Sequence, residues 1–410
     1  MHGGRMGLAR WRIPLAGFLL ALMGGASYAW GVFADPLIAR FGWTSAEAKA
    51  PFTAFMVAFA ASMVPAGKLQ DRWGPRRVAA MGAVLFLVAY GLAALVGRIP
   101  QPAWLVLTYG LVGGTACGLT YAPIAPTVRK WFPDRPGFAI SLALMGFGLA
   151  AAVFAPLKAE LWLVSLGIEG TLLLLALLTS AVSLVAARLI VNPPPGWTPC
   201  EEPSGPRAPA ATAVRMEATP GEAVRSSEFW VLWAAFACAI FGGLLAVGIL
   251  PAFGTRVLGL PALEAATAVT VFAAVNGIGR PLAGWLADRI GAVSVLIVTY
   301  VVQAAALLTL PAFVVDVPTL YGFAAVFGWG FAATLALFPV LASVCFGVEN
   351  LGFVYGLLFT AFGVGALGPV LGSSIFDATG SYTPAFLVSG ALAGLAVALG
   401  TVLRFRYALR

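Results

Sequence analysis

The sequence contains little charge and almost no histidine. Charged residues account for 10% of its 410 residues and hydrophobic residues for 61%, whereas about 25% of residues are charged in a soluble globular protein. The single histidine is His2, so no histidine is available to relay protons inside an apolar core. This composition excludes an ordinary soluble protein and predicts a polytopic membrane protein.

Cysteine is also scarce, and its distribution excludes a metal site or a disulfide framework. Cys117, Cys238 and Cys345 lie in apolar segments and Cys200 in a polar one, without the spacing of metal ligands. We interpret the first three as small core residues. No nucleophile and base stand together in the sequence either, so we expect no catalytic residue, no metal and no cofactor.

Apolar runs of about 20 residues, the length that spans a bilayer as a helix, recur along the whole chain. They predict an all-α membrane protein with twelve transmembrane helices, arranged as an N-terminal six-helix bundle (1–191), a linker (192–227) and a C-terminal six-helix bundle (228–410). The linker is rich in proline and small polar residues. The apolar runs fall at 13–38, 50–67, 77–97, 103–128, 137–157, 167–191, 229–255, 262–287, 292–313, 317–346, 351–376 and 382–403.

The positions of lysine and arginine predict the orientation in the membrane. Of the 24 basic residues, 18 lie in segments that are cytoplasmic if both termini face the cytoplasm. The positive-inside rule therefore places both termini there. Because these residues are dispersed between apolar runs, the net charge of +8 does not indicate a nucleic-acid partner. The alanine- and glycine-rich composition favours a bacterial inner (plasma) membrane. The outer segments hold Arg40, Lys49, Arg98, Lys158 and Arg256, which leaves only Arg280 unassigned.

Arg280 lies deep in an apolar run, eight residues before the polar end of the run at Asp288. At about 1.5 Å per helical residue, it is roughly 12 Å below the surface, farther than an arginine readily extends. No acid of the chain is an evident partner. A substrate carboxylate is one candidate, because a guanidinium binds a carboxylate through two parallel hydrogen bonds. The alternative is a structural arginine bonded to helix carbonyls, one of them freed by Pro281.

Two segments of the first half recur in the second. The loop Gly67-Lys-Leu-Gln-Asp71-Arg72-Trp-Gly74 returns 217 residues later as Gly284-Trp-Leu-Ala-Asp288-Arg289-Ile-Gly291. Gly137-Phe138 returns 215 residues later as Gly352-Phe353. Two parallel repeats imply a pseudo-two-fold axis along the membrane normal, with a site between the halves.

We expect the repeated loop to act as a structural and gating element at the cytoplasmic side. Charge-assisted hydrogen bonds from its residues would hold helix ends together. In this hypothesis Asp71 lies near a helix terminus and Arg129 is its candidate partner. The alternative is a plain positively charged turn without a locking role. The candidate gating residues are Gly67, Asp71, Arg72, Arg129, Asp288 and Arg289.

These motifs resemble a known family. The loop Gly67-x-Leu-x-Asp71-Arg72-x-Gly74-x-Arg76-Arg77 and the layout of apolar runs are similar to those of the major facilitator superfamily. The stretches around Tyr28 and Trp131, and Asn276-x-x-x-Arg280-Pro281, look like those of monocarboxylate transporters and oxalate/formate antiporters. The resemblance implies the major facilitator fold and a secondary transporter that works by alternating access. It also implies that Arg280 holds a substrate carboxylate.

Several neighbours of Arg280 are candidate substrate-binding residues. Asn276, one helical turn earlier, either donates to a substrate oxygen or orients Arg280. Tyr121, beside two prolines, is either a second donor to the carboxylate or a core aromatic residue. Side chains that suit a small apolar tail, but that packing alone also explains, are Tyr28, Met145, Phe331, Leu335, Phe359 and Phe362.

A difference from the family narrows the range of predicted substrates. Oxalate/formate antiporters carry a second cation, a lysine, at the position that Phe362 occupies here. A dicarboxylate would then bury an unpaired negative charge, at a cost of several kcal/mol. We therefore expect a monocarboxylate of the lactate or pyruvate type as substrate. A sensor or a membrane enzyme is the alternative class, but the chain has no signalling domain.

The residues that couple transport to protons in related transporters are absent from this sequence. Animal monocarboxylate transporters use an aspartate and a lysine where this chain has Asn276 and Val32. Carrying a bare anion inward against 100 mV costs about 2.3 kcal/mol, so either proton symport or anion exchange is expected. The resemblance favours symport, with Asp35 as the candidate proton site. The expected partners are thus a small monocarboxylate, protons and membrane lipids, and we expect a monomer.

Overall fold

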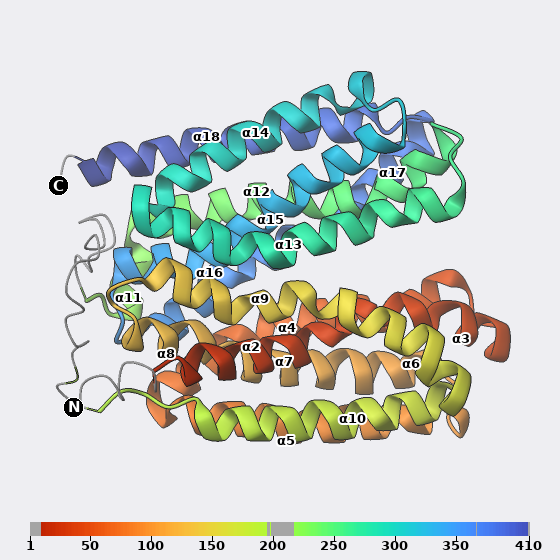
Figure 1. The fold of residues 1–410 in the computed structure, drawn as a ribbon, viewed down its shortest axis with the longest axis horizontal. Coiled ribbons are helices and arrows are strands. Elements are labelled where there is room, and N and C mark those ends of the chain that lie inside the picture. The colour runs from red at the N-terminus through yellow and green to blue at the C-terminus, as the bar shows by residue number, and fades with distance from the viewer. Residues whose placement is uncertain (1–9, 195–196, 198–216, 366, 409–410) are drawn as a thin grey trace.

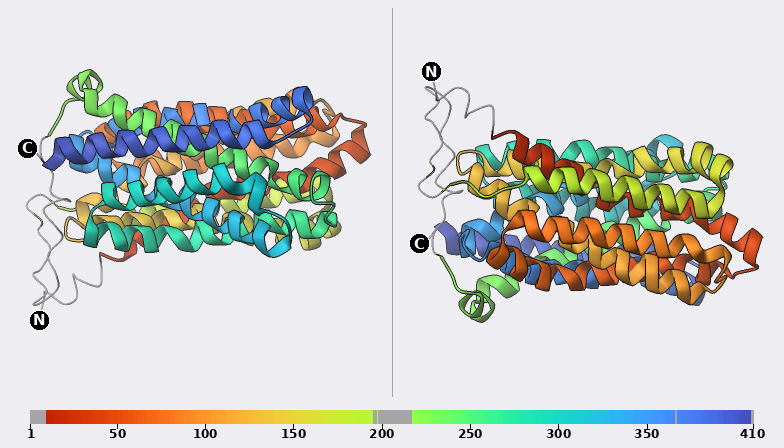
Figure 2. Two further views of the ribbon diagram at one scale, coloured as in Figure 1. Left: turned by 90° about the horizontal axis from the view of Figure 1, so that it is seen from above. Right: turned by 90° about the horizontal axis from the view of Figure 1, so that it is seen from below.

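The computed structural model describes residues 10–194, 197, 217–365 and 367–408, and these residues form helices without strands. Part of the predicted linker (198–216), together with His2 and Cys200, lies outside the described residues. The helices run roughly parallel to the longest axis of the molecule and form two stacked bundles (Figures 1 and 2). The first half of the chain forms one bundle and the second half the other.

The N-terminal bundle begins with an interrupted first pass. After Gly25 the α-helix gives way to a 3-10 segment, in which Ala29 has non-helical dihedral angles. The fourth pass is interrupted near Pro123, which separates α7 from α8. The elements of this half are α2 (Arg12–Gly25), η1 (Ala26–Phe33), α3 (Ala34–Phe41), α4 (Ser45–Trp73), α5 (Pro75–Ala93), η2 (Ala94–Gly97), α6 (Pro102–Leu105), η3 (Val106–Val112), α7 (Gly113–Tyr121), α8 (Ile124–Trp131), α9 (Pro136–Pro156), η4 (Leu157–Trp162) and α10 (Leu163–Leu189).

The C-terminal bundle follows a short helix at the end of the predicted linker. That helix starts with a capping box in which the Thr219 side chain and the Glu222 side chain each accept from the other's backbone N–H. The next helix begins at Ser227, the last residue of the predicted linker. The elements are α11 (Pro220–Arg225), α12 (Ser227–Arg256), α13 (Ala262–Ile290), α14 (Ala292–Phe313), α15 (Val317–Phe346), α16 (Leu351–Gly365), α17 (Gly368–Thr379) and α18 (Thr383–Ala408).

Eleven continuous helical segments of the described chain are long and apolar enough to cross a membrane. The longest, Pro136–Leu189, contains two of the predicted runs. It is broken at Gly167, whose φ of 68° is a conformation that favours glycine, and α9 and α10 pass back and forth on either side of this break (Figure 1). The twelve-helix prediction is therefore confirmed, with two of the helices joined without a loop.

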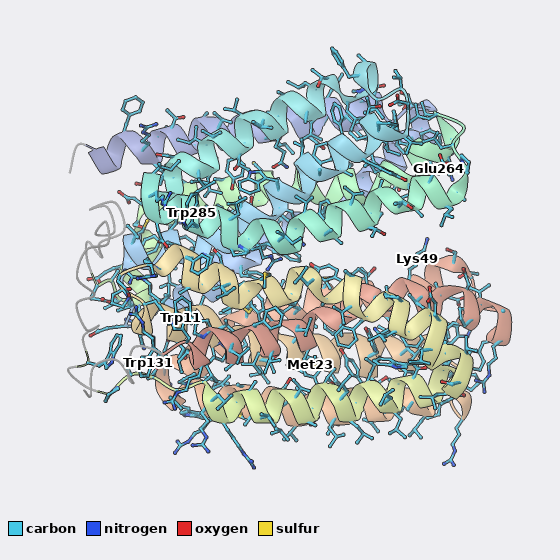
Figure 3. The ribbon with its side chains drawn as sticks, in the orientation of Figure 1. Trp11, Met23, Lys49, Trp131, Glu264 and Trp285 are labelled. Atoms are coloured by element: carbon cyan, nitrogen blue, oxygen red, sulfur yellow. The ribbon has the colours of Figure 1, made fainter. Side chains whose placement is uncertain are left out.

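The ends of the bundles carry tryptophan and charged residues, as expected for a membrane protein. Trp11, Trp131 and Trp285 gather at the end of the molecule that holds α8 and α11, whereas Lys49 and Glu264 lie at the opposite end (Figure 3). Tryptophan is enriched where a protein meets the membrane–water interface. We refer to the end with α8 and α11 as the predicted cytoplasmic end, because it also holds most of the basic loop residues.

The two bundles meet along the pairs α9 with α13 and α4 with α16. Glycine permits this approach: a Cβ on Gly67 would overlap the backbone carbonyl of Gly352, and one on Gly284 would overlap that of Gly137. Small residues at such crossings allow helix backbones to pack closely in membranes. The close contacts at the predicted cytoplasmic end thus depend on glycines from both sequence repeats.

Candidate functional site

Arg280 is fully buried, with 0% of its surface exposed, on α13 at the interface of the two bundles. Its Nη1 donates to the carbonyl of Leu144 on α9, at 2.9 Å. Its Nε and Nη2 donate to Oδ1 of Asn276, at 3.3 and 3.4 Å. Both acceptor atoms are neutral, and none of the ion pairs among the described residues involves Arg280. The guanidinium therefore lies between the halves with an uncompensated charge.

Three tyrosines lie close enough to Arg280 to interact with its charge. They are Tyr28 on η1, Tyr121 on α7 and Tyr355 on α16, and both bundles contribute to the group. The buried hydroxyl of Tyr28 has no hydrogen-bond partner within the described structure. A buried hydroxyl without a partner is costly, so it is suited to bind a polar group that arrives beside Arg280.

Beside Arg280 lies an aromatic cluster that spans both bundles. Phe59 of α4 is at its centre, with ring centroids 5.4 Å from Tyr121, 5.6 Å from Phe147 and 5.1 Å from Phe359. Phe362 stacks on Phe359 at 5.2 Å. We call Phe59, Tyr121, Phe147, Phe359 and Phe362 the aromatic cluster. Such a group offers an apolar wall to a small ligand.

The structure brings most of the predicted binding residues to this region. Asn276 bonds directly to Arg280, and the Phe331 ring lies 6.4 Å from that of Phe362. Leu335 is buried on α15. Met145 is half-buried and forms no described hydrogen bond, whereas its neighbour Leu144 supplies a carbonyl to Arg280.

Three residues of this region were missed from the sequence: Phe59, Phe147 and Tyr355. Phe59 and Phe147 belong to uniformly apolar runs, in which no pattern separates interface residues from core residues. Tyr355 did carry a signal, because it stands one and two helical turns before Phe359 and Phe362 on the same helix face.

The predicted proton site is not brought to Arg280. Asp35 is exposed on α3, and no described hydrogen bond or ion pair connects it with the residues around Arg280. The sequence placed it near the outer end of the first pass, and in the structure it lies in the first turn of α3, directly after the 3-10 segment. No Asp or Glu is among the buried residues of the described chain.

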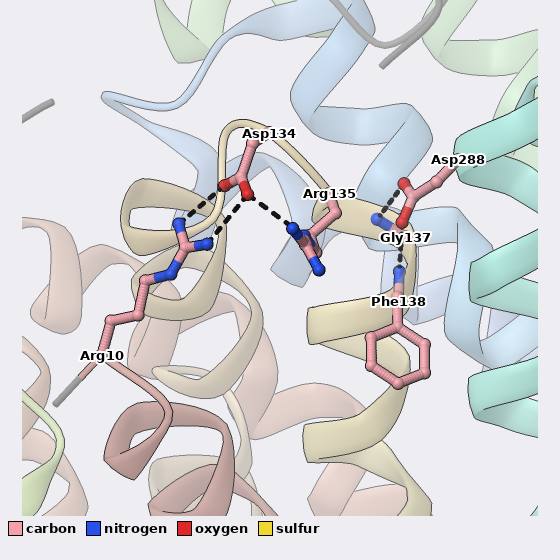
Figure 4. A network of polar contacts seen from close by, with 6 residues as sticks. All are labelled: Arg10, Asp134, Arg135, Gly137, Phe138 and Asp288. Atoms are coloured by element: carbon pink, nitrogen blue, oxygen red, sulfur yellow. Dashed lines mark hydrogen bonds and ion pairs between the residues drawn. The ribbon is translucent and has the colours of Figure 1, made fainter. Parts of the chain in front are cut away.

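A second polar site joins the bundles at the predicted cytoplasmic end. The carboxylate of Asp288 on α13 accepts from the backbone N–H groups of Gly137 and Phe138, at 2.7 and 2.8 Å (Figure 4). These groups open α9, and a helix N-terminus attracts negative charge. The carboxylate thus caps a helix of the opposite half.

Asp71 makes the equivalent contact in the other direction. From α4 it accepts from the N–H groups of Gly352 and Phe353, at 3.2 and 2.8 Å, at the start of α16. The two sequence repeats therefore contact each other. The loop aspartate of each half caps the helix that begins at the Gly-Phe pair of the other half. We call these two contacts the helix latch. The sequence contained both repeats, but only the fold shows that they meet.

The predicted partner of Asp71 was wrong. Arg129 is buried, and its Nε donates to Oγ of Ser343 on α15, at 2.9 Å. Its charge acts on Asp288, whereas the cation near Asp71 is Lys130. The physical reason is that backbone N–H groups already occupy the Asp71 carboxylate. Arg129 still bridges the bundles, but from α8 to α15.

The loop arginines do not form the helix latch. Arg72 is exposed, and Arg289 stacks over the ring of Trp285, with its guanidinium carbon 3.7 Å from the ring centroid. The aspartates and the glycines Gly67 and Gly284 make the contacts between the halves. The contacts that the loop makes between the halves are thus those of its acidic and small residues, and the gating role of the loop stays a prediction.

Lys158 is buried although it lies in a predicted outer segment. It was assigned to an outer segment, yet it is fully buried on η4, with 0% of its surface exposed. Its Nζ donates to the carbonyl of Ala26 at 2.7 Å and lies 5.5 Å from the centroid of the Phe33 ring. Because α9 continues into η4 without a loop, the side chain enters the bundle. Arg280 is therefore not the only buried cation.

Comparisons with known proteins agree with this architecture. The Major Facilitator Superfamily profile matches residues 15–269 and 249–408. The oxalate:formate antiporter of Oxalobacter formigenes is 29% identical over 402 residues, which cover 97% of this chain and 92% of that protein. Monocarboxylate transporter 13 of Bos taurus is 30% identical over 400 residues, which cover 94% and 88%.

A solved structure shows the same fold. The Escherichia coli fucose:proton symporter FucP superimposes with a TM-score of 0.69 at 17% identity, over 96% of this chain and 99% of FucP. The profile and the curated relatives span nearly the whole sequence, and these relatives are transporters rather than enzymes. The chain belongs to the major facilitator superfamily and is a multi-pass membrane transporter.

Proposed function

We propose that this transporter carries a small monocarboxylate of the lactate or pyruvate type by alternating access, together with a proton. The observation that carries the proposal is the fully buried guanidinium of Arg280, which has only neutral partners. An unpaired buried charge is costly, and a substrate carboxylate would relieve that cost. The predicted site residues are thus proposed as a carboxylate site centred on Arg280.

The hydrogen-bonding capacity of Arg280 supports this assignment. A guanidinium has five N–H donors, and three are directed to Leu144 and Asn276 in the described structure. Beyond these bonds and an interaction with the Tyr121 hydroxyl, donors of the guanidinium can hold a carboxylate, with the free hydroxyl of Tyr28 as a further donor. Substrate contacts with Arg280 from α13 and with Tyr28 from η1 would connect the two bundles, as alternating access requires.

The aromatic cluster favours one carboxylate over two. Phe362 is 2% exposed and stacks on Phe359, so that end of the site is apolar. A methyl group or short chain fits against such a surface. A second carboxylate there would be desolvated without a counter-charge, which costs several kcal/mol.

Phe362→Lys is therefore expected to change the preference between acids. The added cation should weaken L-lactate binding and strengthen oxalate binding, each by about tenfold, which corresponds to about 1.4 kcal/mol. Competition of each acid with labelled L-lactate in proteoliposomes measures the change. Leu335→Lys, on a different helix, tests whether any buried cation has this effect. An unchanged oxalate affinity in Phe362→Lys would contradict the role of Phe362.

Anion exchange is the second candidate mode, favoured by the similarity to the oxalate:formate antiporter over 97% of the chain. Purified protein in liposomes separates the two modes. Under symport, an acidic exterior drives accumulation of labelled L-lactate into liposomes that contain no carboxylate. Under exchange, accumulation requires liposomes preloaded with a carboxylate and does not respond to the pH gradient. Absence of L-lactate movement in both assays would refute the proposed substrate class.

A further inference from the structure

The buried charges of the described chain are all basic. The charged side chains classed as buried are Arg10, Arg129, Lys158 and Arg280. Arg10 pairs with Asp134, Arg129 bonds to Ser343 and Arg280 bonds to Asn276 and Leu144. Lys158 has a single described hydrogen bond, to the Ala26 carbonyl, and belongs to none of the described ion pairs. An ammonium has three donors, so its needs are incompletely met.

The surroundings of Lys158 contain no counter-charge at bonding distance. Its element η4 packs against α9, α10 and η1. α9 carries no titratable side chain, and the nearest acid on η4 itself, Glu160, is exposed. On α10, Glu169 is paired with Arg40 at 2.8 Å and Arg188 lies in the last turn. On η1 the titratable group is Tyr28.

Lys158 contacts both ends of the segment that carries Tyr28. Its Nζ bonds to the carbonyl of Ala26, the first residue of η1, and lies against the ring of Phe33, the last residue. The Tyr28 hydroxyl interacts with the charge of Arg280. The state of the Lys158 amine can therefore be transmitted through η1 to the proposed carboxylate site.

Proton symport requires a group that takes up and releases a proton. Arginine keeps its proton, and the described carboxylates are exposed, half-buried or engaged: Asp35 is exposed, and Asp71 and Asp288 hold the helix latch at the other end. A buried lysine can exchange its proton during a functional cycle. Among the described buried cations, Lys158 is the one with this chemistry.

We propose that Lys158 is the proton-binding site of this transporter and that it positions Tyr28 through the Ala26 carbonyl. The inference rests on the proposed carboxylate symport. In the protonated form, the ammonium holds η1 and attracts the anion bound at Arg280. Coupling between two binding sites is reciprocal, so the carboxylate in turn favours the proton on Lys158. Both ligands then cross together, and the amine releases its proton at the other side.

Two substitutions test the role of Lys158 in proteoliposomes with labelled L-lactate. Lys158→Met removes the amine but keeps a long side chain, and Lys158→Arg keeps a permanent charge. Exchange against preloaded L-lactate moves no net proton, so it should persist in both variants at a reduced rate. Accumulation driven by an acidic exterior should fall at least about tenfold relative to exchange, as expected for loss of a coupling free energy. Lys49→Met, at an exposed lysine, should behave like the unmodified protein.

A pH series adds a readout that a purely structural role would not change. The unmodified protein should bind L-lactate more weakly as pH rises through the titration of Lys158, whereas Lys158→Arg should show a flat profile. Full pH-driven accumulation in Lys158→Met, or its restoration in Lys158→Arg, would overturn the inference. If the unmodified protein exchanges L-lactate without a response to pH, Lys158 is not a proton site although the Arg280 site stands. If it moves no L-lactate at all, both proposals fall.

Discussion

Arg280→Lys is expected to lower L-lactate transport by at least about 100-fold, since each hydrogen bond to a charged group contributes about 1.5–3 kcal/mol. Lysine keeps the charge but loses the planar pair of donors that matches a carboxylate. It also cannot bond to the Leu144 carbonyl and Asn276 together, as the guanidinium does at 2.9 and 3.3 Å. Initial rates of L-lactate exchange in proteoliposomes measure the effect.

Two comparisons show whether the loss is specific to the site. Arg289→Lys changes an exposed arginine of the same helix, and its exchange rate should equal that of the unmodified protein. Arg280→Met removes a buried charge that lacks a counter-ion, so it should abolish transport without loss of thermal stability. Transport by Arg280→Lys at the unmodified rate, or unfolding of Arg280→Met, would instead identify Arg280 as a structural residue.

Loss of the helix latch is expected to shift the transporter toward opening at the predicted cytoplasmic end. Each aspartate accepts two backbone N–H bonds from the opposite half, and removal of a helix cap costs about 0.5–2 kcal/mol. In the double variant Asp71→Ala/Asp288→Ala, which removes both capping side chains, the costs combine to roughly 3 kcal/mol, or about a 100-fold change in the equilibrium between the two states.

Reaction of a buried thiol reports this opening. Ser141 is fully buried, and its hydroxyl faces Gly284 across the interface of the bundles. With the four native cysteines replaced, Ser141→Cys should react with a thiol reagent up to about 100-fold faster in the double variant, in proportion to the population of the open state.

Asp134→Ala is the matched control for the helix latch. Asp134 pairs with Arg10 at 3.0 Å (Figure 4), and both residues belong to the N-terminal half, so this pair does not join the bundles. Its loss should leave the reactivity of Ser141→Cys unchanged. An equal rate in the double variant and the unmodified background would show that the latch does not hold this end closed.

Much of the architecture follows from the sequence because a bilayer leaves few choices. Apolar runs of the right length must form helices, since backbone groups in lipid have no other partners. The spacing of the loop and Gly-Phe repeats revealed the two halves, and the depth of Arg280 in its run selected it as the centre of the proposed site. These inferences need only one-dimensional periodicity and the cost of a buried charge.

The tertiary structure decided which residues meet. Apolar runs of Leu, Ala, Phe and Gly do not reveal which face packs against the other half, so Phe59 and Phe147 could not be selected. The pairing of Asp71 with the start of α16, rather than with Arg129, depends on helices nearly 300 residues apart coming within hydrogen-bond reach (|i−j| 281).

Lys158 is the clearest example of a residue whose surroundings cannot be predicted from the sequence. In the sequence it stands between two apolar runs, where a basic residue is normally solvated, and a charge count alone assigned it to the outside. Only the continuation of α9 into η4 turns its amine inward to the Ala26 carbonyl. The sequence by itself determined a twelve-helix carrier with a buried arginine, because composition and periodicity act locally. Partners of buried charges depend on packing between distant helices, which only the folded chain specifies.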